Sequence, residues 1–280
     1  MHTLGTQQQL DPRQWREHLF GLPKERWLRL QGRSFWITGA GTGFGRSLAV
    51  ALAAAGAQVF ITGRRKQKLE ETLREIEGLG ISSAACQVIP ADITDVEQVK
   101  RACEVVMWSC NTLYGLVNNA ALPSRGDISK PLLQGSLTDW EQIMKTNVTA
   151  PWLLTRSIFP HMVKGREIRV LLISSEAGWT FTSGFGPYNI SKAALNSLGG
   201  SMAAEFTVSY PNADIQINVL IPGEARTEMN QGSNESPYAI VNMALILLSH
   251  PQGGPNGKFF HRDGRHYAFC SAMPYEKPLI

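Results

Sequence analysis

The chain has little cysteine and none of the features that direct a protein to export or into a membrane. Its four cysteines among 280 residues form no CxxC pair, so we expect reduced thiols rather than a disulfide framework. The first ten residues lack the basic segment followed by an apolar one that marks a secretory signal. No uninterrupted apolar run reaches the length of a membrane span. These absences predict a cytoplasmic protein with no membrane partner.

Metal-ligand spacings and internal repeats are also absent. The six histidines are scattered, and His261 and His266 flank the segment HRDGRH without a recognised ligand spacing, so we predict no metal site. No repeat or low-complexity stretch interrupts the chain. A hydrophobic fraction of 43% and a charged fraction of 18% over 280 residues fit one ordinary α/β domain with a full core.

The small excess of positive charge lies in an N-terminal extension, residues 1–30. The first 33 residues hold six Lys and Arg against three Asp and Glu, with no block of consecutive basic residues. Asp11-Pro12 is typical of a helix start, and residues 24–30 form a second short helical segment. We interpret this basic, aromatic helical extension as a subunit contact, with packing on its own domain as the alternative. The charge pattern does not favour a nucleic-acid partner.

The most informative segment is the glycine-rich stretch SFWITGAGTGFG at residues 34–45. Residues 34–38 are too few, too aromatic and too β-branched for a helix, whereas the sequence from residue 44 has apolar side chains at helical spacing. The glycines therefore connect a strand to a helix. A backbone without Cβ atoms can turn sharply there and present free N–H groups to a pyrophosphate. The pattern predicts a dinucleotide site, with plain tight packing as the alternative.

The end of the second predicted strand, residues 58–62, indicates which dinucleotide. A carboxylate at this place usually binds the ribose 2'-hydroxyl, but the chain has Gly63 followed by Arg64 and Arg65. Guanidinium groups bind a 2'-phosphate well. The sequence therefore favours NADP(H) over NAD(H) and favours Arg64 as the ligand; the alternative is that both arginines are a solvated start of the next helix.

The rest of the chain alternates strands and helices. We expect further strands at residues 84–89, 113–118, 167–174, 214–220 and 258–261, and further helices at residues 66–78, 95–109, 138–161, 188–210 and 237–249. This alternation implies a parallel sheet covered on both faces, with ligands beyond the carboxyl ends of the strands. We assign residues 31–265 to this Rossmann-fold domain and residues 266–280 to a C-terminal tail.

Four residues suggest the chemistry: Asn147, Ser175, Tyr188 and Lys192. Tyr188 and Lys192 are four apart, so in one helix the ammonium lies beside the phenol and favours its ionised form. Carbonyl reduction needs such an acid to protonate the oxygen as hydride arrives, and a second donor such as Ser175 to hold that oxygen. Asn147, a poor helix former, could help to hold a water near Lys192. Each residue alone has an ordinary structural explanation, but their combination indicates selection for chemistry.

The motifs together resemble the short, single-domain branch of the short-chain dehydrogenase/reductase family. The matching residues are Thr38-Gly39-x-x-x-Gly43-x-Gly45, Asp92, Asn118-Asn119-Ala120, Asn147, Ser175, Tyr188-x-x-x-Lys192, and Pro222-Gly223 with Thr227. The resemblance covers about residues 31–264. It implies a Rossmann-type, doubly wound sheet of seven parallel strands with helices on both faces. It also implies a homodimer or homotetramer joined through the helices that hold Asn147 and Tyr188.

The resemblance also implies individual roles. Tyr188 would be the general acid/base, Ser175 would hold the carbonyl, Lys192 would lower the tyrosine pKa and contact the nicotinamide ribose, and Asn147 would anchor a water-linked proton relay. Asp92 would contact the adenine and Thr227 the carboxamide region. The expected cofactor-binding residues are Gly39, Thr42, Gly43, Phe44, Gly45, Arg64, Asp92, Ile93, Asn119, Ala120, Tyr188, Lys192, Pro222, Gly223 and Thr227.

Three places depart from the family pattern. Ala121 replaces a glycine often found there, the lead before the first strand is long, and residues 228–236 are short where many relatives carry a helical lid. The pocket would then be more open, or be completed by the tail. Trp179, Phe181 and Phe185 are expected to line the substrate side, with simple core packing as the alternative.

We therefore predict an NADP(H)-dependent oxidoreductase that transfers a hydride between nicotinamide and a small-molecule carbonyl or secondary alcohol. 3-Oxoacyl thioesters, keto sugars and cyclic ketones all remain open as substrates. The alternative is a non-catalytic dinucleotide-binding scaffold or sensor, which would not need a proton relay. An epimerase or dehydratase of the longer branch is disfavoured, because the chain lacks the extra C-terminal substrate domain.

Overall fold

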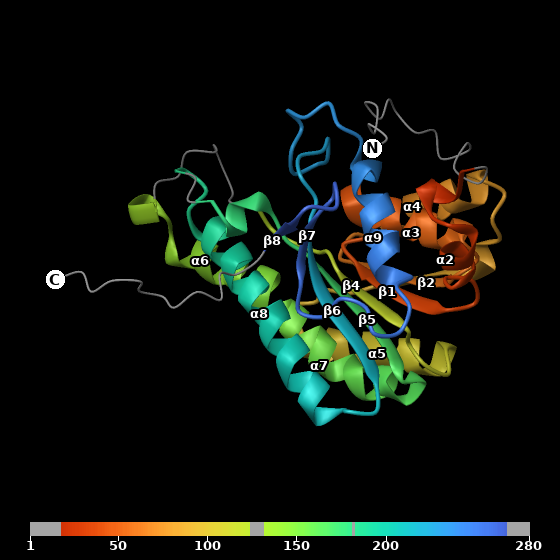
Figure 1. Cartoon of the computed structure of the whole chain (residues 1–280). Coiled ribbons are helices and arrows are strands. Elements are labelled where there is room, and N and C mark those ends of the chain that lie inside the picture. Colours follow the sequence, from red (N-terminus) through yellow and green to blue (C-terminus); the bar gives the residue numbers. More distant parts are fainter. Residues whose placement is uncertain (1–17, 124–131, 181–182, 268–280) are drawn as a thin grey trace.

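A twisted, mostly parallel sheet forms the centre of the molecule, with helices on both faces (Figure 1). The computed structural model describes residues 18–123, 132–180 and 183–267. The strand order is β3-β2-β1-β4-β5-β6-β7-β8. The strands are β1 (Ser34–Thr38), β2 (Gln58–Gly63), β3 (Cys86–Pro90), β4 (Gly115–Asn118), β5 (Glu167–Ile173), β6 (Asp214–Ile221), β7 (Phe259–His261) and β8 (His266–Tyr267).

The first seven strands are parallel, which confirms the predicted Rossmann-type sheet. Strand β1 lies between β2 and β4, and Trp36 is in register with both Phe60 and Leu116. The eighth strand was not predicted. It lies at the start of the expected tail and pairs antiparallel with β7, where Phe259 opposes Tyr267.

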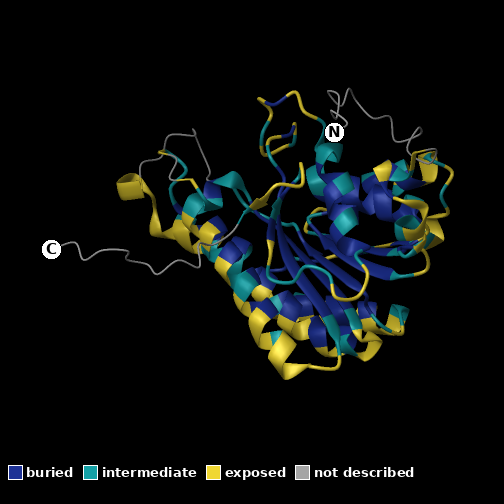
Figure 2. Cartoon of the chain, viewed as in Figure 1, coloured by how far each residue is buried: buried dark blue, intermediate teal, exposed yellow. Residues whose placement is uncertain are grey.

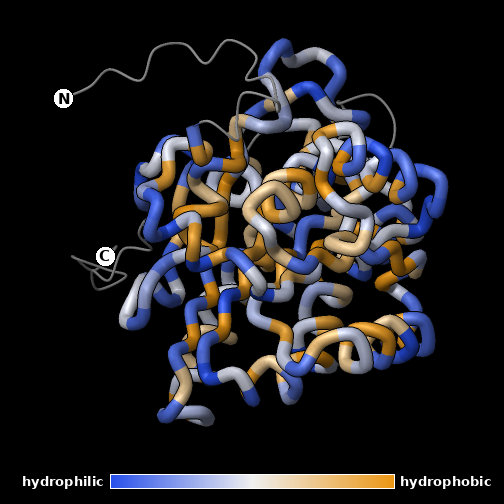
Figure 3. The backbone as a smooth tube through the Cα atoms, turned by 90° about the vertical axis from the view of Figure 1, so that its right-hand side faces the viewer, coloured by the Kyte–Doolittle hydropathy of each residue, from blue (hydrophilic) through white to orange (hydrophobic). Residues whose placement is uncertain are grey.

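The helices form two layers, each of which buries its apolar face against the sheet. The helices are α2 (Lys24–Leu28), α3 (Gly43–Ala54), α4 (Lys66–Gly78), α5 (Val96–Ser109), α6 (Leu137–Met144), α7 (Ala150–Met162), α8 (Pro187–Ser209) and α9 (Val241–Leu248). One hydrophobic cluster joins the sheet to α3, α4 and α9, and the other joins it to α5, α7 and α8. The strands and the inner helix faces are accordingly buried (Figure 2). Hydrophobic stretches run through the interior, and the outermost loops are largely hydrophilic (Figure 3).

The single long helix expected at residues 138–161 is interrupted. Helix α6 continues into a π-helical segment, Lys145–Thr149, before α7 begins. Pro151 in the first turn of α7 has no N–H and cannot donate to the carbonyl of Asn147 four residues earlier, so the regular ladder is broken there. The break contains Asn147, one of the predicted catalytic residues.

The described part of the N-terminal extension, from residue 18 onward, packs on its own domain, and a subunit contact of the extension stays a prediction. Phe20, Leu22 and Leu30 are buried in the cluster around α9. The guanidinium groups of Arg26 and Arg29 donate to carbonyl oxygens of Ile246 and Ser249 at the end of that helix. Such contacts satisfy carbonyls that a helix terminus leaves unpaired. The start predicted at Asp11-Pro12 lies outside the described residues.

Candidate active site

The glycine-rich turn between β1 and α3 fits tightly against the end of β4. Gly39 has a φ of +65°, and a Cβ atom there would lie 2.8 Å from the Cα of Ala120. At Gly45 a Cβ would lie 2.5 Å from the carbonyl oxygen of Gly39. Both distances are shorter than real Cβ atoms tolerate, so these positions require glycine. The turn can therefore bring its backbone close to a ligand.

Hydrogen bonds fix the end of β4 to the end of β1. The Thr38 hydroxyl accepts from the backbone N–H groups of Asn119 and Ala120 at 3.0 and 3.1 Å. The side-chain amide of Asn119 donates to the carbonyls of Thr38 and Gly39. The predicted Asn119 and Ala120 thus lie beside the glycine turn, and the Asn119 side chain stabilises its shape.

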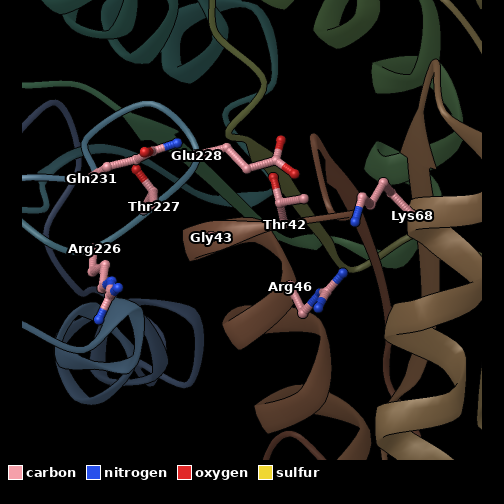
Figure 4. A pocket seen from close by; sticks show the side chains of 8 residues that line it. All are labelled: Thr42, Gly43, Arg46, Lys68, Arg226, Thr227, Glu228 and Gln231. Atoms are coloured by element: carbon pink, nitrogen blue, oxygen red, sulfur yellow. The ribbon is translucent and has the colours of Figure 1, made fainter.

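A pocket of about 440 Å³ opens in front of α3, and Figure 4 shows the residues that line it. The predicted residues Thr42, Gly43 and Thr227 are among them. The Thr42 side chain makes no capping bond to α3, so the first N–H groups of this 12-residue helix remain available to an anion. Thr227 comes from the loop after β6 and lies over Gly43, where a Cβ would be 3.1 Å from its methyl carbon.

Several lining residues were not predicted, and most of them are charged. Arg46 and Lys68 both contact Glu71, and Arg226 and Glu228 come from the loop after β6. The glycine-rich sequence held one further signal that was missed, Gly41. A Cβ atom at Gly41 would lie 2.8 Å from the Cβ of Lys68, so this glycine lets α4 approach the turn.

The two arginines after β2 have different surroundings. Arg65 makes an ion pair of 2.5 Å with Glu228. This pair connects the start of α4 to the loop after β6. Arg64 is exposed and makes no ion pair or hydrogen bond with the described residues. Arg64 is therefore the guanidinium that is free to bind an added anion.

The other predicted cofactor residues lie at the same edge of the sheet. Asp92 follows β3, and its Oδ1 accepts from the backbone and hydroxyl of Thr94, while Ile93 is buried. Pro222 and Gly223 follow β6, and Gly223 has a φ of +66°. These residues stand beyond the carboxyl ends of parallel strands, where ligands of such sheets bind.

Ser175, Tyr188 and Lys192 converge at the carboxyl end of β5. Tyr188 and Lys192 lie one turn apart in α8, with the Lys192 Nζ 5.6 Å from the centre of the phenol ring. The buried Lys192 ammonium donates to the carbonyl of Ile173, the last residue of β5, at 2.9 Å. Ser175 follows two residues later, and its hydroxyl accepts from the N–H of Ala177.

Burial shifts the two titratable groups in opposite directions. It raises the pKa of Tyr188 to about 12, while a hydrogen bond with the Ser175 side chain opposes this rise and the charge of Glu176 adds to it. Burial lowers the pKa of Lys192 to about 8. Both shifts follow from the cost of a charge in a poorly solvated place. The tyrosine pKa thus lies above its ordinary value in this structure, because burial outweighs the other effects, and the lowering of this pKa by Lys192 stays a prediction.

Asn147 binds protein groups on two sides. Its Oδ1 accepts from the N–H of Leu122 at 2.8 Å, and its Nδ2 donates to the Leu122 carbonyl and to the Ser191 hydroxyl at 3.0 Å. That hydroxyl donates in turn to the carbonyl of Tyr188. Asn147 therefore connects the loop after β4 to the helix of Tyr188 and Lys192. The predicted water near Lys192 remains a prediction.

The expected aromatic wall is only partly present. Trp179 packs on Phe259 and stacks on Tyr267, which is the core-packing alternative. Phe185 lies near Tyr188, with their ring centres 6.3 Å apart, and its place on the substrate side stays a prediction. Phe181 lies outside the described residues.

Among the described residues, no three or more His, Cys, Asp or Glu side chains are grouped so that they could hold a metal ion. None of the described helices is both long and apolar enough to cross a membrane.

Comparison with known proteins identifies the class. A family model described as short chain dehydrogenase matches residues 34–237. The match spans more than half of the chain and includes the glycine turn, Ser175, Tyr188 and Lys192. The chain therefore belongs to the short chain dehydrogenase family and has the oxidoreductase fold of that family.

Individual relatives agree with this assignment. The chain is 28% identical to a 3-oxoacyl-[acyl-carrier-protein] reductase of Aquifex aeolicus, over 85% of this chain and 98% of the relative. It is 31% identical to a gluconate 5-dehydrogenase of Gluconobacter oxydans, over 72% of this chain and 75% of the relative. A metagenomic short-chain oxidoreductase solved in complex with NADP superposes with a TM-score of 0.70 at 26% identity, covering 82% of this chain and 96% of the other.

Proposed function

We propose that the protein is an NADP(H)-dependent oxidoreductase that interconverts a ketone and a secondary alcohol, with Tyr188 as the general acid/base. The observation that supports this most is the convergence of Ser175, Tyr188 and Lys192 at the end of β5, on the same edge of the sheet as the glycine turn. A scaffold or sensor would need the glycine turn but not this group of side chains.

The residues of the glycine turn and pocket fit a dinucleotide. The uncapped start of α3 offers N–H groups to a pyrophosphate, and glycine is required where the backbone must be approached closely. Gly63 places no carboxylate against a 2'-phosphate, and Arg64 offers a free guanidinium. These features support NADP(H) over NAD(H), as does the NADP bound to a structural relative.

The bound cofactor supplies or accepts the hydride at the carbonyl carbon. The Ser175 hydroxyl holds the carbonyl oxygen, and Tyr188 donates its proton to that oxygen as negative charge builds up there. The product then carries a new C–H bond and a new O–H bond. The Lys192 ammonium stabilises the phenolate that Tyr188 becomes, because the two groups share one face of α8. Asn147 holds α8 against the loop after β4.

The substrate class is narrowed only by the names of the relatives. One acts on 3-oxoacyl groups carried by a protein and another on gluconate. These names favour an oxoacyl thioester and a keto sugar acid as candidates. A cyclic ketone remains the third candidate.

We also propose that the chain forms a homodimer or homotetramer through α6, α7 and α8. Large apolar side chains on these helices are exposed: Leu137 by 71%, Trp140 by 37%, Trp152 by 42% and Ile190 by 37%. A group of exposed aromatic and aliphatic side chains is typical of a protein contact.

The test is the oxidation of NADPH with those three carbonyl classes by the native protein and by Tyr188→Phe. Removing the acid should lower kcat by roughly 10²-fold to 10⁴-fold, with NADPH affinity retained. Tyr210→Phe, at the far end of the same helix, is the matched control and should retain turnover. Equal turnover in native protein and Tyr188→Phe would contradict the mechanism, and NADPH binding with no turnover of any class would favour the scaffold alternative.

A further inference from the structure

Three titratable residues meet beside Ser175 without a part in the mechanism above. Glu176 directly follows Ser175, His261 is the last residue of β7, and Asp263 lies in the turn after it. The His261 Nε2 is 3.3 Å from Glu176 Oε1, and its Nδ1 is 2.8 Å from Asp263 Oδ1. The imidazole thus lies between two carboxylates, one in the segment after β5 and the other in the turn after β7.

The position of this cluster places it at the mouth of the site. Strand β6 lies between β5 and β7 (Figure 1), so the Glu176–His261 contact crosses over the end of β6. Gly223 follows that strand, and a Cβ atom there would lie 3.3 Å from His261 Nε2. The Arg262 guanidinium is nearer still, with its Nε 3.0 Å from that Cβ position, so His261 and Arg262 together pack over the Pro222-Gly223 turn.

One oxygen of the Glu176 carboxylate contacts His261, and the other is available to a ligand. Asp263 is fixed by Arg265, whose Nε donates to its Oδ2 at 2.8 Å, and the His261 side chain is 90% buried. Glu176 is more accessible, with 43% of its side chain exposed. Within the described residues its carboxylate makes no polar contact besides the one with His261, so its second oxygen can accept from a ligand.

The charge of Glu176 also acts on the reacting group. Burial is the main reason that the pKa of Tyr188 is raised, but the negative charge of Glu176 contributes to the rise. Glu176 directly follows Ser175 in the chain, and its side chain is partly exposed. A substrate whose carbonyl oxygen lies between Ser175 and Tyr188 would therefore bring a neighbouring substituent towards Glu176.

We propose that Glu176 is a specificity-determining residue that accepts a hydrogen bond from a hydroxyl or ammonium group next to the substrate carbonyl. His261 and Asp263 are positioning residues that hold the carboxylate in place. The inference rests on the proposed function and narrows its substrate class to ketones that carry a neighbouring hydrogen-bond donor. A carboxylate at the mouth of the site would repel a substrate with an anionic group at the same place.

The test uses three ketones that differ only in that substituent: hydroxyacetone, aminoacetone and butanone. The native protein should prefer the first two, measured as kcat/KM with NADPH. Glu176→Met keeps the side-chain length but removes the acceptor, and it should lower the preference over butanone by roughly tenfold or more, because a bond to a charged group contributes about 1.5–3 kcal/mol. Glu176→Gln keeps a neutral acceptor, and it should retain more of the preference for hydroxyacetone than for aminoacetone.

Controls separate this inference from the proposed function. His261→Gln should reduce the preference for hydroxyacetone and aminoacetone over butanone. Its thermal midpoint shows whether the variant still folds, and its NADPH dissociation constant shows whether it still binds the cofactor. Glu205→Gln removes an exposed charge elsewhere on α8 and should leave the preference intact. Preferences unchanged within about twofold in Glu176→Met would overturn the role of Glu176, while loss of turnover in Tyr188→Phe would still support the reductase. If native protein that binds NADPH reduces none of the three, the proposed preference of Glu176 for a neighbouring donor is overturned, while turnover of one of the three carbonyl classes tested above would still support the reductase.

Discussion

Lys192 and Tyr188 lie one helical turn apart, and burial makes the charged form of each unfavourable. The pKa of Lys192 is lowered to about 8 and that of Tyr188 is raised to about 12. At pH 7 Tyr188 is therefore neutral, whereas Lys192 still holds its proton in most molecules, at a cost to the folded state. Lys192 would contact the nicotinamide ribose of a bound nucleotide, and hydrogen bonds to the ribose hydroxyls would favour the ammonium and, through it, the phenolate that the proposed reaction forms.

This buried lysine makes stability depend on pH in a predictable direction. The unfolded chain holds the Lys192 proton up to its ordinary pKa of 10.5, whereas the folded protein loses it near pH 8. The folded state is therefore penalised at neutral pH, and the penalty disappears as the pH rises from 8 to 10.5. Lys192→Met should be more stable than the native protein at pH 7, and this advantage should shrink by on the order of 3 kcal/mol by pH 10.5. Denaturant unfolding of both proteins across this range measures the difference, and a difference that does not change with pH would contradict the lowered pKa.

The pair of arginines after β2 offers a matched test of cofactor choice. Arg64→Ala removes the free guanidinium and should weaken NADPH by roughly tenfold to a hundredfold, because a charge-assisted bond contributes about 1.5–3 kcal/mol, with little effect on NADH. Arg65→Ala is the control, because its guanidinium already pairs with Glu228. Dissociation constants from nucleotide fluorescence give both comparisons. An equal loss for NADPH and NADH in Arg64→Ala would refute the assignment.

Sequence spacing was sufficient to propose the catalytic and cofactor-binding residues, but it could not show their contacts. The four-residue interval predicted that Tyr188 and Lys192 share a helix face, and the structure places them so. The ion pair of Arg65 with Glu228 joins segments 163 positions apart, and no local pattern predicts such a contact. The cluster around His261 was not predicted for the same reason, because His261 meets Glu176 only through the fold.

At the scale of elements, the π-helical segment holds Asn147 where its amide can bind the loop after β4. Asn147 is buried, and its three hydrogen bonds reach Leu122 and Ser191. Asn147→Ala removes the partners of the Leu122 N–H and carbonyl and should destabilise the protein by about 2–4 kcal/mol, with a loss of turnover because α8 is less firmly held. Thermal and denaturant unfolding test the first effect and NADPH oxidation the second.

An exposed asparagine provides the control for this substitution. Asn212 lies at the surface after α8, and Asn212→Ala should change stability by less than about 0.5 kcal/mol. Equal stability in the Asn147 and Asn212 variants would mean that the Asn147 amide does not stabilise the fold.

Helical periodicity could not reveal the interruption at residues 145–149. Apolar residues continue at helical spacing from α6 into α7, so the sequence predicts one helix. The break depends on the missing N–H of Pro151 and on the partners that Asn147 finds in space. Proline is common in the first turn of a helix. The spacing of the apolar residues alone therefore does not predict whether the helix bends, breaks or restarts at Pro151.

For the whole molecule, alternation of strands and helices was enough to predict the seven parallel strands. The eighth strand has only two residues, His266–Tyr267, which is too short for any periodic signal. The sequence did not show where the N-terminal extension packs, and its predicted subunit contact stays a prediction. Its apolar side chains indicate burial but not the surface that buries them, and the contacts of Phe20 and Leu30 with the cluster around α9 are visible only in three dimensions.

The exposed apolar side chains of α6 to α8 predict how the chain assembles. Replacing Trp140 and Trp152 together by Glu places two charges on the proposed contact and should convert the oligomer into a monomer, as judged by light scattering after size-exclusion chromatography. Leu28→Glu is the control, since Leu28 is 51% exposed on α2 but lies beside α9. A native protein that is already monomeric, or a double variant that remains oligomeric, would contradict this contact.

The central claim is a hydride transfer from NADPH to a carbonyl carbon, and isotope transfer tests it most directly. The protein would be incubated with a ketone that it reduces and with NADPH carrying deuterium at both positions of nicotinamide C4, and the alcohol analysed by mass spectrometry. We expect one deuterium on the carbinol carbon and none on its oxygen after exchange, because the oxygen receives its proton through Tyr188. An alcohol without deuterium on that carbon, or NADPH that binds and is never consumed, would contradict the account.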